Sequence, residues 1–209
     1  MKYKQYYNKN YGMTLVEVLV ALAIFVVIMG AVITFQINVF SYERTASGSF
    51  ITVQDAQTIL KVMGKELRMA SQGGDGSYAI QGASTSTVTF FADINNDNKK
   101  EKVKYYFSKS TSSILKTTTL PTGSPATYSN INTSTTTIMV NVRNATSTPM
   151  FEYFDSDYNG SGIALTQPVV NTSIRLIRVN ITLDTDPNKL PEPRTYSTQI
   201  TLRNLKDNL

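Results

Sequence analysis

The most apolar stretch of the chain lies near its N-terminus. Every residue from Val18 to Ile33 is apolar or glycine, and Phe35 extends the run beyond Thr34. These 18 residues, rising about 1.5 Å each in a helix, span about 27 Å, which is close to the hydrocarbon thickness of a bilayer. The pattern therefore predicts a membrane-spanning helix.

The residues that follow have the spacing of an amphipathic helix. Apolar side chains recur at intervals of three and four at Val53, Ala56, Leu60, Met63, Leu67 and Ala70. Such spacing places one face of a helix against the rest of a protein. No proline precedes residue 121, so we expect one helix from Met13 to about Ala70, ended by the sequence QGGDG at 72–76.

Beyond Tyr78 the pattern becomes that of strands and turns. Six segments are rich in β-branched and aromatic residues, namely 87–94, 102–108, 113–119, 137–142, 174–183 and 196–205. Turn-forming sequences such as NNDNKK and DSDYNGSG separate them. Because no second helical pattern lies between the strands, we predict an α+β fold, in which the long N-terminal helix packs by its C-terminal half on an antiparallel β-sheet domain.

Composition argues against most kinds of enzyme. The 209 residues include no Cys and no His, which excludes thiol nucleophiles, histidine bases, His-containing triads and the common zinc sites. No glycine-rich phosphate-binding loop of Walker or Rossmann spacing occurs. We therefore expect a protein without enzymatic activity.

The positive charge is concentrated at the start of the chain. Lys2, Lys4 and Lys9 lie in residues 1–12 without an acid, which leaves +2 of the formal net charge of +5 for the rest. So small a net charge does not favour nucleic-acid binding. Lysines directly before a membrane span place the N-terminus in the cytoplasm. The predicted parts are a basic leader (1–12), a transmembrane half-helix (13–40), an amphipathic half-helix (41–71) and an extracytoplasmic β domain (77–209).

A secretory signal peptide also combines a basic start with an apolar core. Its core is usually shorter and ends at a cleavage site of small residues. Here the sequence FQINVFSYERTASGSF continues after the run with large side chains. The unusual feature lies on the other side, where Gly12 and Met13 directly precede the run. An ordinary cleaved signal and a plain anchor remain the alternatives.

The sequence GMTLVEVLVALAIF, which begins at Gly12, resembles the class III signal of type IV prepilins and type II secretion pseudopilins. In that family a basic leader ends in glycine, prepilin peptidase cuts after it, and the new N-terminal residue is N-methylated. The resemblance implies cleavage between Gly12 and Met13 and methylation of Met13. It also implies an assembly role for Thr14 and Glu17. The first residue after the cleavage site is usually Phe in this family, and in this chain it is Met13.

Glu17 is the one charged residue between Met13 and Phe40. After cleavage, a charged amine at Met13 would lie at the edge of the apolar stretch. In surroundings of low dielectric a cation and an anion attract strongly, and each offsets the desolvation of the other. The family picture pairs Glu17 of one subunit with the Met13 amine of the subunit below it. The alternative is that Glu17 only reaches the headgroups.

Finer resemblances point to PilW-like minor pilins and J-type minor pseudopilins. FFADINNDNKKEKVKYYF (90–107), followed by SILK, is similar to their hairpin of aromatic strand, acidic turn and basic strand. FEYFDSDYNG, IRLIRVNITL and TQITLRNL resemble their final hairpin. Filament pilins of this family often have a proline around the position of Thr34, and its absence here also favours a minor pilin or a pseudopilin.

The resemblance implies a tip or priming subunit of a type IV pilus or a type II secretion pseudopilus. Its expected partners are other pilin or pseudopilin subunits, prepilin peptidase and the inner-membrane assembly platform. The chain would lie in the inner membrane before assembly. The alternative is a membrane-anchored adhesin or DNA-uptake module, whose Ser/Thr-rich β domain binds a ligand. The sequence is compatible with a machine for motility, adhesion, DNA uptake or secretion.

Two acidic loops have the spacing of calcium-binding loops. The candidate ligands are Asp93, Asn95 and Asp97 in the first, and Asp155, Asp157 and Asn159 in the second, which matches more closely because Gly160 follows. Neither has Glu at the twelfth position, where Lys104 and Thr166 stand. Turns rich in Asp and Asn have the same residue pattern without binding a metal. We therefore expect no cofactor, with calcium as the alternative.

Overall fold

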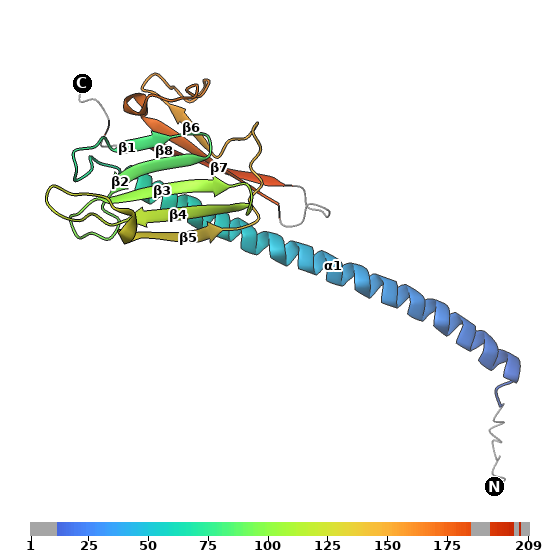
Figure 1. Cartoon of the computed structure of the whole chain (residues 1–209). Helices are drawn as coiled ribbons and strands as arrows, with labels where there is room; N and C mark the ends of the chain where they lie inside the picture. The colour runs from blue at the N-terminus through green and yellow to red at the C-terminus, as the bar shows by residue number, and fades with distance from the viewer. Residues whose placement is uncertain (1–11, 185–192, 203–204, 206–209) are drawn as a thin grey trace, which may run out of the picture. The chain divides into compact units, whose positions relative to one another are not determined.

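The structure is a computed structural model that describes residues 12–184, 193–202 and 205 (Figure 1). The predicted leader therefore lies outside the described residues, apart from Gly12. The chain divides into two compact units, Met1–Ser47 and Gly48–Leu209. A single helix, α1 (Leu15–Arg68), begins in the first unit and ends in the second.

The predicted long helix is confirmed, and it ends two residues before the expected position. α1 continues through Gly30, where the hydroxyl of Thr34 donates a hydrogen bond of 2.9 Å to the Gly30 carbonyl. Its last turn tightens, because the amides of Met69 and Ala70 bond to carbonyls only three residues earlier. The glycine-rich residues 72–76 follow as a turn.

The first part of α1 is apolar on every side. Leu15–Phe40, 26 residues, is long and apolar enough to cross a membrane. Every side chain from Met13 to Phe40 is exposed within the first unit. A helix with apolar residues all around is stable only where lipid or other apolar helices cover it. The first unit thus presents an apolar surface of the kind that lipid or other apolar helices cover.

Within its described residues, the second unit contains antiparallel sheets, which confirms the predicted α+β fold. There are two such sheets, whereas the sequence interpretation expected one. The five-stranded sheet has the order β1 (Ile80–Ala83), β2 (Thr87–Ala92), β3 (Glu101–Ser108), β4 (Ser113–Thr119) and β5 (Thr133–Met139). The three-stranded sheet has the order β6 (Phe151–Phe154), β7 (Leu176–Leu183) and β8 (Arg194–Thr201). Two short 3-10 helices, η1 (Asn130–Asn132) and η2 (Asn171–Ser173), lie in the connections. Consecutive strands are neighbours throughout each sheet.

Five of the six predicted strands correspond to β2, β3, β4, β7 and β8. The sixth, predicted at 137–142, corresponds to β5 but lies too far along the chain. β5 begins four residues earlier, at Thr133, because threonine hydroxyls of β4 and β5 pair across the strands. The Thr117–Thr135 and Thr119–Thr133 hydroxyl pairs lie at 2.9 and 2.8 Å. The strand ends before Asn141, whose φ of 60° is left-handed. This turn interrupts the ladder, so β6 pairs with β7 instead of extending the first sheet.

One hydrophobic core joins both sheets to the amphipathic part of α1. The predicted helical face is buried at Ala56, Leu60, Met63, Leu67 and Ala70, while Val53 is half-buried. Glu66 on the same part of α1 accepts bonds from Tyr105 of β3 and Lys116 of β4. Figure 1 shows this end of α1 behind the five-stranded sheet. A Cβ on Gly64 would lie 3.7 Å from Ile200, so the helix also contacts β8.

Candidate processing and assembly segment

Thr14 and Glu17 close the N-terminus of α1 with reciprocal hydrogen bonds. The Thr14 hydroxyl oxygen accepts the Glu17 amide at 3.3 Å. In return, Glu17 Oε2 accepts the Thr14 amide at 2.9 Å and the Thr14 hydroxyl at 3.0 Å. This arrangement is a capping box, which satisfies amides that have no partner inside the helix. It gives both residues a local structural role that the sequence interpretation missed, although the spacing Thr-x-x-Glu is its known signal.

The capping box also fixes where the carboxylate lies. Both of its bonds from Thr14 converge on Oε2, and Oε1 takes no part in them. Glu17 is exposed, as are its neighbours on the helix. The structure therefore holds one carboxylate at the exposed N-terminal end of an apolar helix, with an oxygen available to a group from another molecule.

Gly12 and Met13 precede the helix in an exposed, non-helical segment. No atom lies within 4 Å of the place where a Cβ on Gly12 would stand, and its φ is outside the left-handed region. Neither space nor backbone conformation in this chain therefore requires glycine there. A requirement for glycine would come from an enzyme that binds the segment, and the exposed position permits such an approach.

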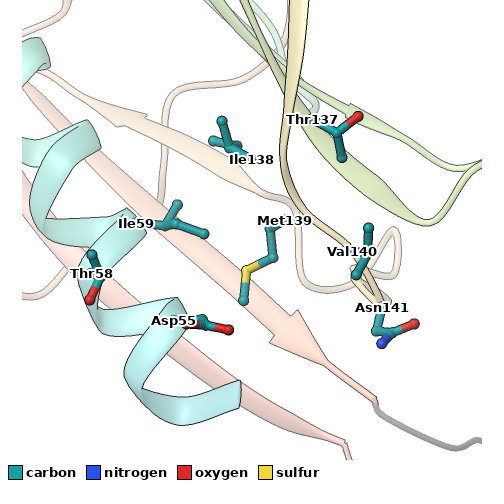
Figure 2. Close-up of a pocket in the computed structure, with 8 residues that line it drawn as sticks. All are labelled: Asp55, Thr58, Ile59, Thr137, Ile138, Met139, Val140 and Asn141. Carbon is teal, nitrogen blue, oxygen red and sulfur yellow. The ribbon is translucent and has the colours of Figure 1, made fainter. Parts of the chain in front are cut away.

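The second unit offers a groove between α1 and the edge strand β5, with a volume of about 470 Å³. Figure 2 shows Ile59 of α1 and Met139 of β5 on its two sides, with Thr58 and Asn141 among the polar lining residues. Asp55 is the one ionisable side chain that lines it. The other polar side chains that line it are the hydroxyls of Thr58 and Thr137 and the amide of Asn141.

The two acidic loops differ in how they place the predicted calcium ligands. In the first loop, Asp93 accepts the amides of Asp97 and Asn98, which draws the loop around its carboxylate. In the second, Asp155 and Asn159 head two separate turns, bonded to the amides of Asp157 and Ser161. Among the described residues, no three His, Cys, Asp or Glu side chains form a group that could hold a metal ion.

Comparison with known families identifies one match, at the N-terminal segment. Residues 7–33 match the prokaryotic N-terminal methylation motif. The match includes Gly12, Met13, Thr14 and Glu17 together with the first part of α1. A search of curated proteins finds no match to the chain. The motif indicates a precursor of the pilin or pseudopilin type that prepilin peptidase processes, and thus a structural subunit.

Proposed function

We propose that the chain is a minor pilin or minor pseudopilin, cleaved after Gly12 and methylated at Met13. It would join a type IV pilus or a type II secretion pseudopilus through α1, as a tip or priming subunit of the PilW or J type. The observation that carries the proposal is the methylation motif at 7–33, which leads into a helix with apolar side chains exposed on all sides. The antiparallel sheets on the C-terminal half of the same helix agree with a pilin fold.

Assembly moves the apolar helix from lipid to a bundle of similar helices. Lipid tails and apolar side chains are alike in polarity, so the hydrophobic effect does little to drive or oppose this transfer. Packing and polar contacts then determine how the helices align. Glu17 is the one charged side chain in the span, so its partner would set the register between neighbours.

The proposed partner is the Met13 amine of an adjacent subunit. The capping box keeps the Glu17 carboxylate at the helix terminus, and Oε1 would accept the incoming ammonium group. The amine exists only after cleavage, because before it Met13 is joined to Gly12 by a peptide bond. Processing would therefore create the contact that assembly uses. Before assembly the subunit would lie in the inner membrane, with its N-terminus in the cytoplasm.

Replacing Gly12 tests this proposal. Gly12→Val should leave the structure unchanged, because no atom lies within 4 Å of its Cβ, and should block cleavage. Mass spectrometry of the chain from its native host should then find the full-length precursor and no methylated Met13. The variant should be absent from isolated filaments. Gly30→Ala is the matched control, since Gly30 also has open space around it, and it should be processed normally.

Two results would contradict the proposal. One is a wild-type chain whose N-terminus in the cell is still Met1. The other is a Gly12→Val chain that stays uncleaved and yet keeps full biological activity, which is the behaviour of a membrane-anchored binding module.

A further inference from the structure

Another cavity of the second unit, with a volume of about 680 Å³, lies where three connections of the chain meet. The β1–β2 turn contributes Thr85 and Ser86, and the β3–β4 turn contributes Lys109 and Ser112. Residues between β5 and β6, within the range 142–150, form the remaining side. Ligand pockets in proteins usually have volumes of about 300–1,000 Å³. This cavity is therefore large enough for a small organic ligand.

Hydrogen bonds inside the chain hold the three connections together. The Ser86 carbonyl accepts the Phe107 amide at 2.9 Å. The Ser112 carbonyl accepts the Val142 amide, also at 2.9 Å. The side chain of Asn144 bonds to a carbonyl and an amide of β7, at 2.9 and 3.1 Å. Because these contacts already fix the walls, a ligand would not have to order them, which removes one cost of binding.

The cavity carries positive charge that its own lining does not neutralise. Lys109 and Arg143 are its ionisable lining side chains, and no Asp or Glu of the described residues lines it. Both residues are exposed, and neither side chain forms an ion pair or a hydrogen bond within the described part of the chain. The groove between α1 and β5 differs, because its one ionisable lining side chain is the acid Asp55. Two unpaired cations that line one cavity attract an anionic ligand.

The rest of the lining combines apolar surface with hydroxyl groups. Val142 and Met150 are 0% and 1% exposed, and Phe107 is half-buried. Four hydroxyl-bearing residues whose hydroxyls form no hydrogen bond within the described part of the chain also line the cavity, namely Thr85, Ser86, Ser112 and Thr146. A hydroxyl both donates and accepts hydrogen bonds. Such a lining suits a ligand with hydroxyl groups at its edge and C–H groups on its faces, which is the chemistry of a sugar ring.

We propose that this cavity binds a saccharide that carries a carboxylate or a phosphate group. The guanidinium of Arg143 would bind the anionic group through two parallel N–H bonds, and Lys109 would add a second positive charge. The hydroxyl-bearing residues would bond to the sugar hydroxyls, and Phe107 would contact a C–H face of the ring. The site goes beyond the proposed function and does not depend on it, because none of its residues belongs to the methylation motif at 7–33.

Two other classes of anion fit the cavity less well. A small inorganic anion would contact the cations but would leave the apolar lining in water. A nucleic acid is bound along an extended basic surface, whereas this cavity offers the side chains of Lys109 and Arg143 alone as cations. The combination of charge, hydroxyl groups and apolar surface therefore favours an anionic saccharide.

Calorimetric titration of the full chain tests the proposal, in a polyoxyethylene detergent whose headgroup contains no sugar and no charge. The anionic probes are trigalacturonate and a hexose phosphate, and maltotriose is the neutral control. At least one anionic probe should bind to one site with a Kd of about 10⁻⁴–10⁻³ M, about tenfold or more tighter than maltotriose. Whichever of the two binds more tightly identifies the anionic group. At a salt concentration of about 0.5 M the affinity should fall several-fold.

Three results of this titration would overturn the proposal. The first is that neither anionic probe binds. The second is that maltotriose or inorganic phosphate binds as tightly as the better anionic probe. The third is that a single-stranded oligonucleotide binds more tightly than either anionic saccharide.

Variants of the two cations locate the site. Arg143→Gln and Lys109→Gln should each weaken binding of the anionic probe about tenfold. The melting temperature of each should stay within about 1 °C of the wild type, because neither side chain has a partner within the described part of the chain. Lys99→Gln is the matched control, since Lys99 is exposed in the β2–β3 turn, at the other end of β3, and its loss changes the net charge equally. Unchanged affinity in both cavity variants, or an equal loss in Lys99→Gln, would refute the assignment.

Discussion

The phenol of Tyr105 on β3 donates a hydrogen bond of 2.7 Å to the carboxylate of Glu66 on α1. Both side chains are largely buried, and Lys116 of β4 forms an ion pair with the other oxygen of the same carboxylate. Burial raises the pKa of the Tyr105 hydroxyl, and the Glu66 charge raises it further, so the phenol stays protonated and remains a donor. These contacts tie the long helix to two strands of the five-stranded sheet.

Removing the carboxylate should destabilise the second unit strongly. Glu66→Ala leaves the ammonium of Lys116 and the hydroxyl of Tyr105 without their partner, which we expect to lower the free energy of unfolding by about 2–4 kcal/mol. Tyr105→Phe keeps the ion pair and should cost about 1–2 kcal/mol. Thermal melting of the full chain in detergent measures both. Lys61→Gln, exposed on the same helix, is the control and should change stability by less than about 0.5 kcal/mol. Equal stability of Glu66→Ala and Lys61→Gln would contradict the prediction.

The turn that ends α1 should tolerate little additional volume. A Cβ on Gly73 would lie 3.1 Å from the ring of Phe91, which is fully buried, and 2.6 Å from an Asp75 oxygen that accepts the Ser77 amide. Gly73→Ala must therefore shift the ring or break that bond. We expect it to cost about 1–3 kcal/mol and to lower the melting temperature by several degrees.

Gly82→Ala is the matched control for this substitution. At Gly82 the nearest side chain lies 3.8 Å from the new Cβ, which is ordinary contact, and the backbone is not left-handed. Its melting temperature should equal or slightly exceed that of the wild type. A Gly73→Ala chain as stable as Gly82→Ala would show that the turn can rearrange around a methyl group.

The parts of the fold that local patterns predict are those with regular apolar spacing. The helical stripe that includes Met63 and Leu67 was identified correctly because one face of α1 covers a core. β1 and β6 were not among the six predicted strands, since four residues are too few to establish alternation. β5 was displaced because threonine pairs, rather than alternating apolar residues, define it. The division into two sheets depends on which distant strands pair, and local sequence does not encode that choice.

The candidate sites show the same limit. The motif around Gly12 is continuous in sequence, and the family comparison supports a precursor of this type. Cleavage after Gly12 itself stays a prediction. The spacing Thr-x-x-Glu also signals the capping role of Glu17, a local role that the family resemblance does not indicate. Glu101 is buried at the start of β3, where its carboxylate accepts the Ile94 amide. This placement follows from the pairing of β2 with β3, which local sequence does not encode.

Two substitutions separate the capping role of Glu17 from its proposed role between subunits. Glu17→Gln keeps a capping-box side chain, because Gln also serves at this position, but it removes the charge that would attract the Met13 amine. Thr14→Ala does the reverse. It removes the hydroxyl that bonds to the Glu17 amide and carboxylate, and it keeps the charge. Both variants should be cleaved at Gly12 like the wild type, as mass spectrometry of the membrane fraction would show.

Filament incorporation should then differ between the two. If the charge pair aligns neighbouring subunits, Glu17→Gln should be recovered in isolated filaments at about a tenth of the wild-type level or less, relative to its amount in the membrane. Thr14→Ala should be reduced less, because a frayed first turn still carries the carboxylate. If Glu17 acts only as a helix cap, the order is reversed, since Gln preserves the cap and Ala at position 14 does not. Quantitative immunoblotting of filament and membrane fractions distinguishes the two orders, and the reversed order would refute intersubunit pairing while leaving processing at Gly12 intact.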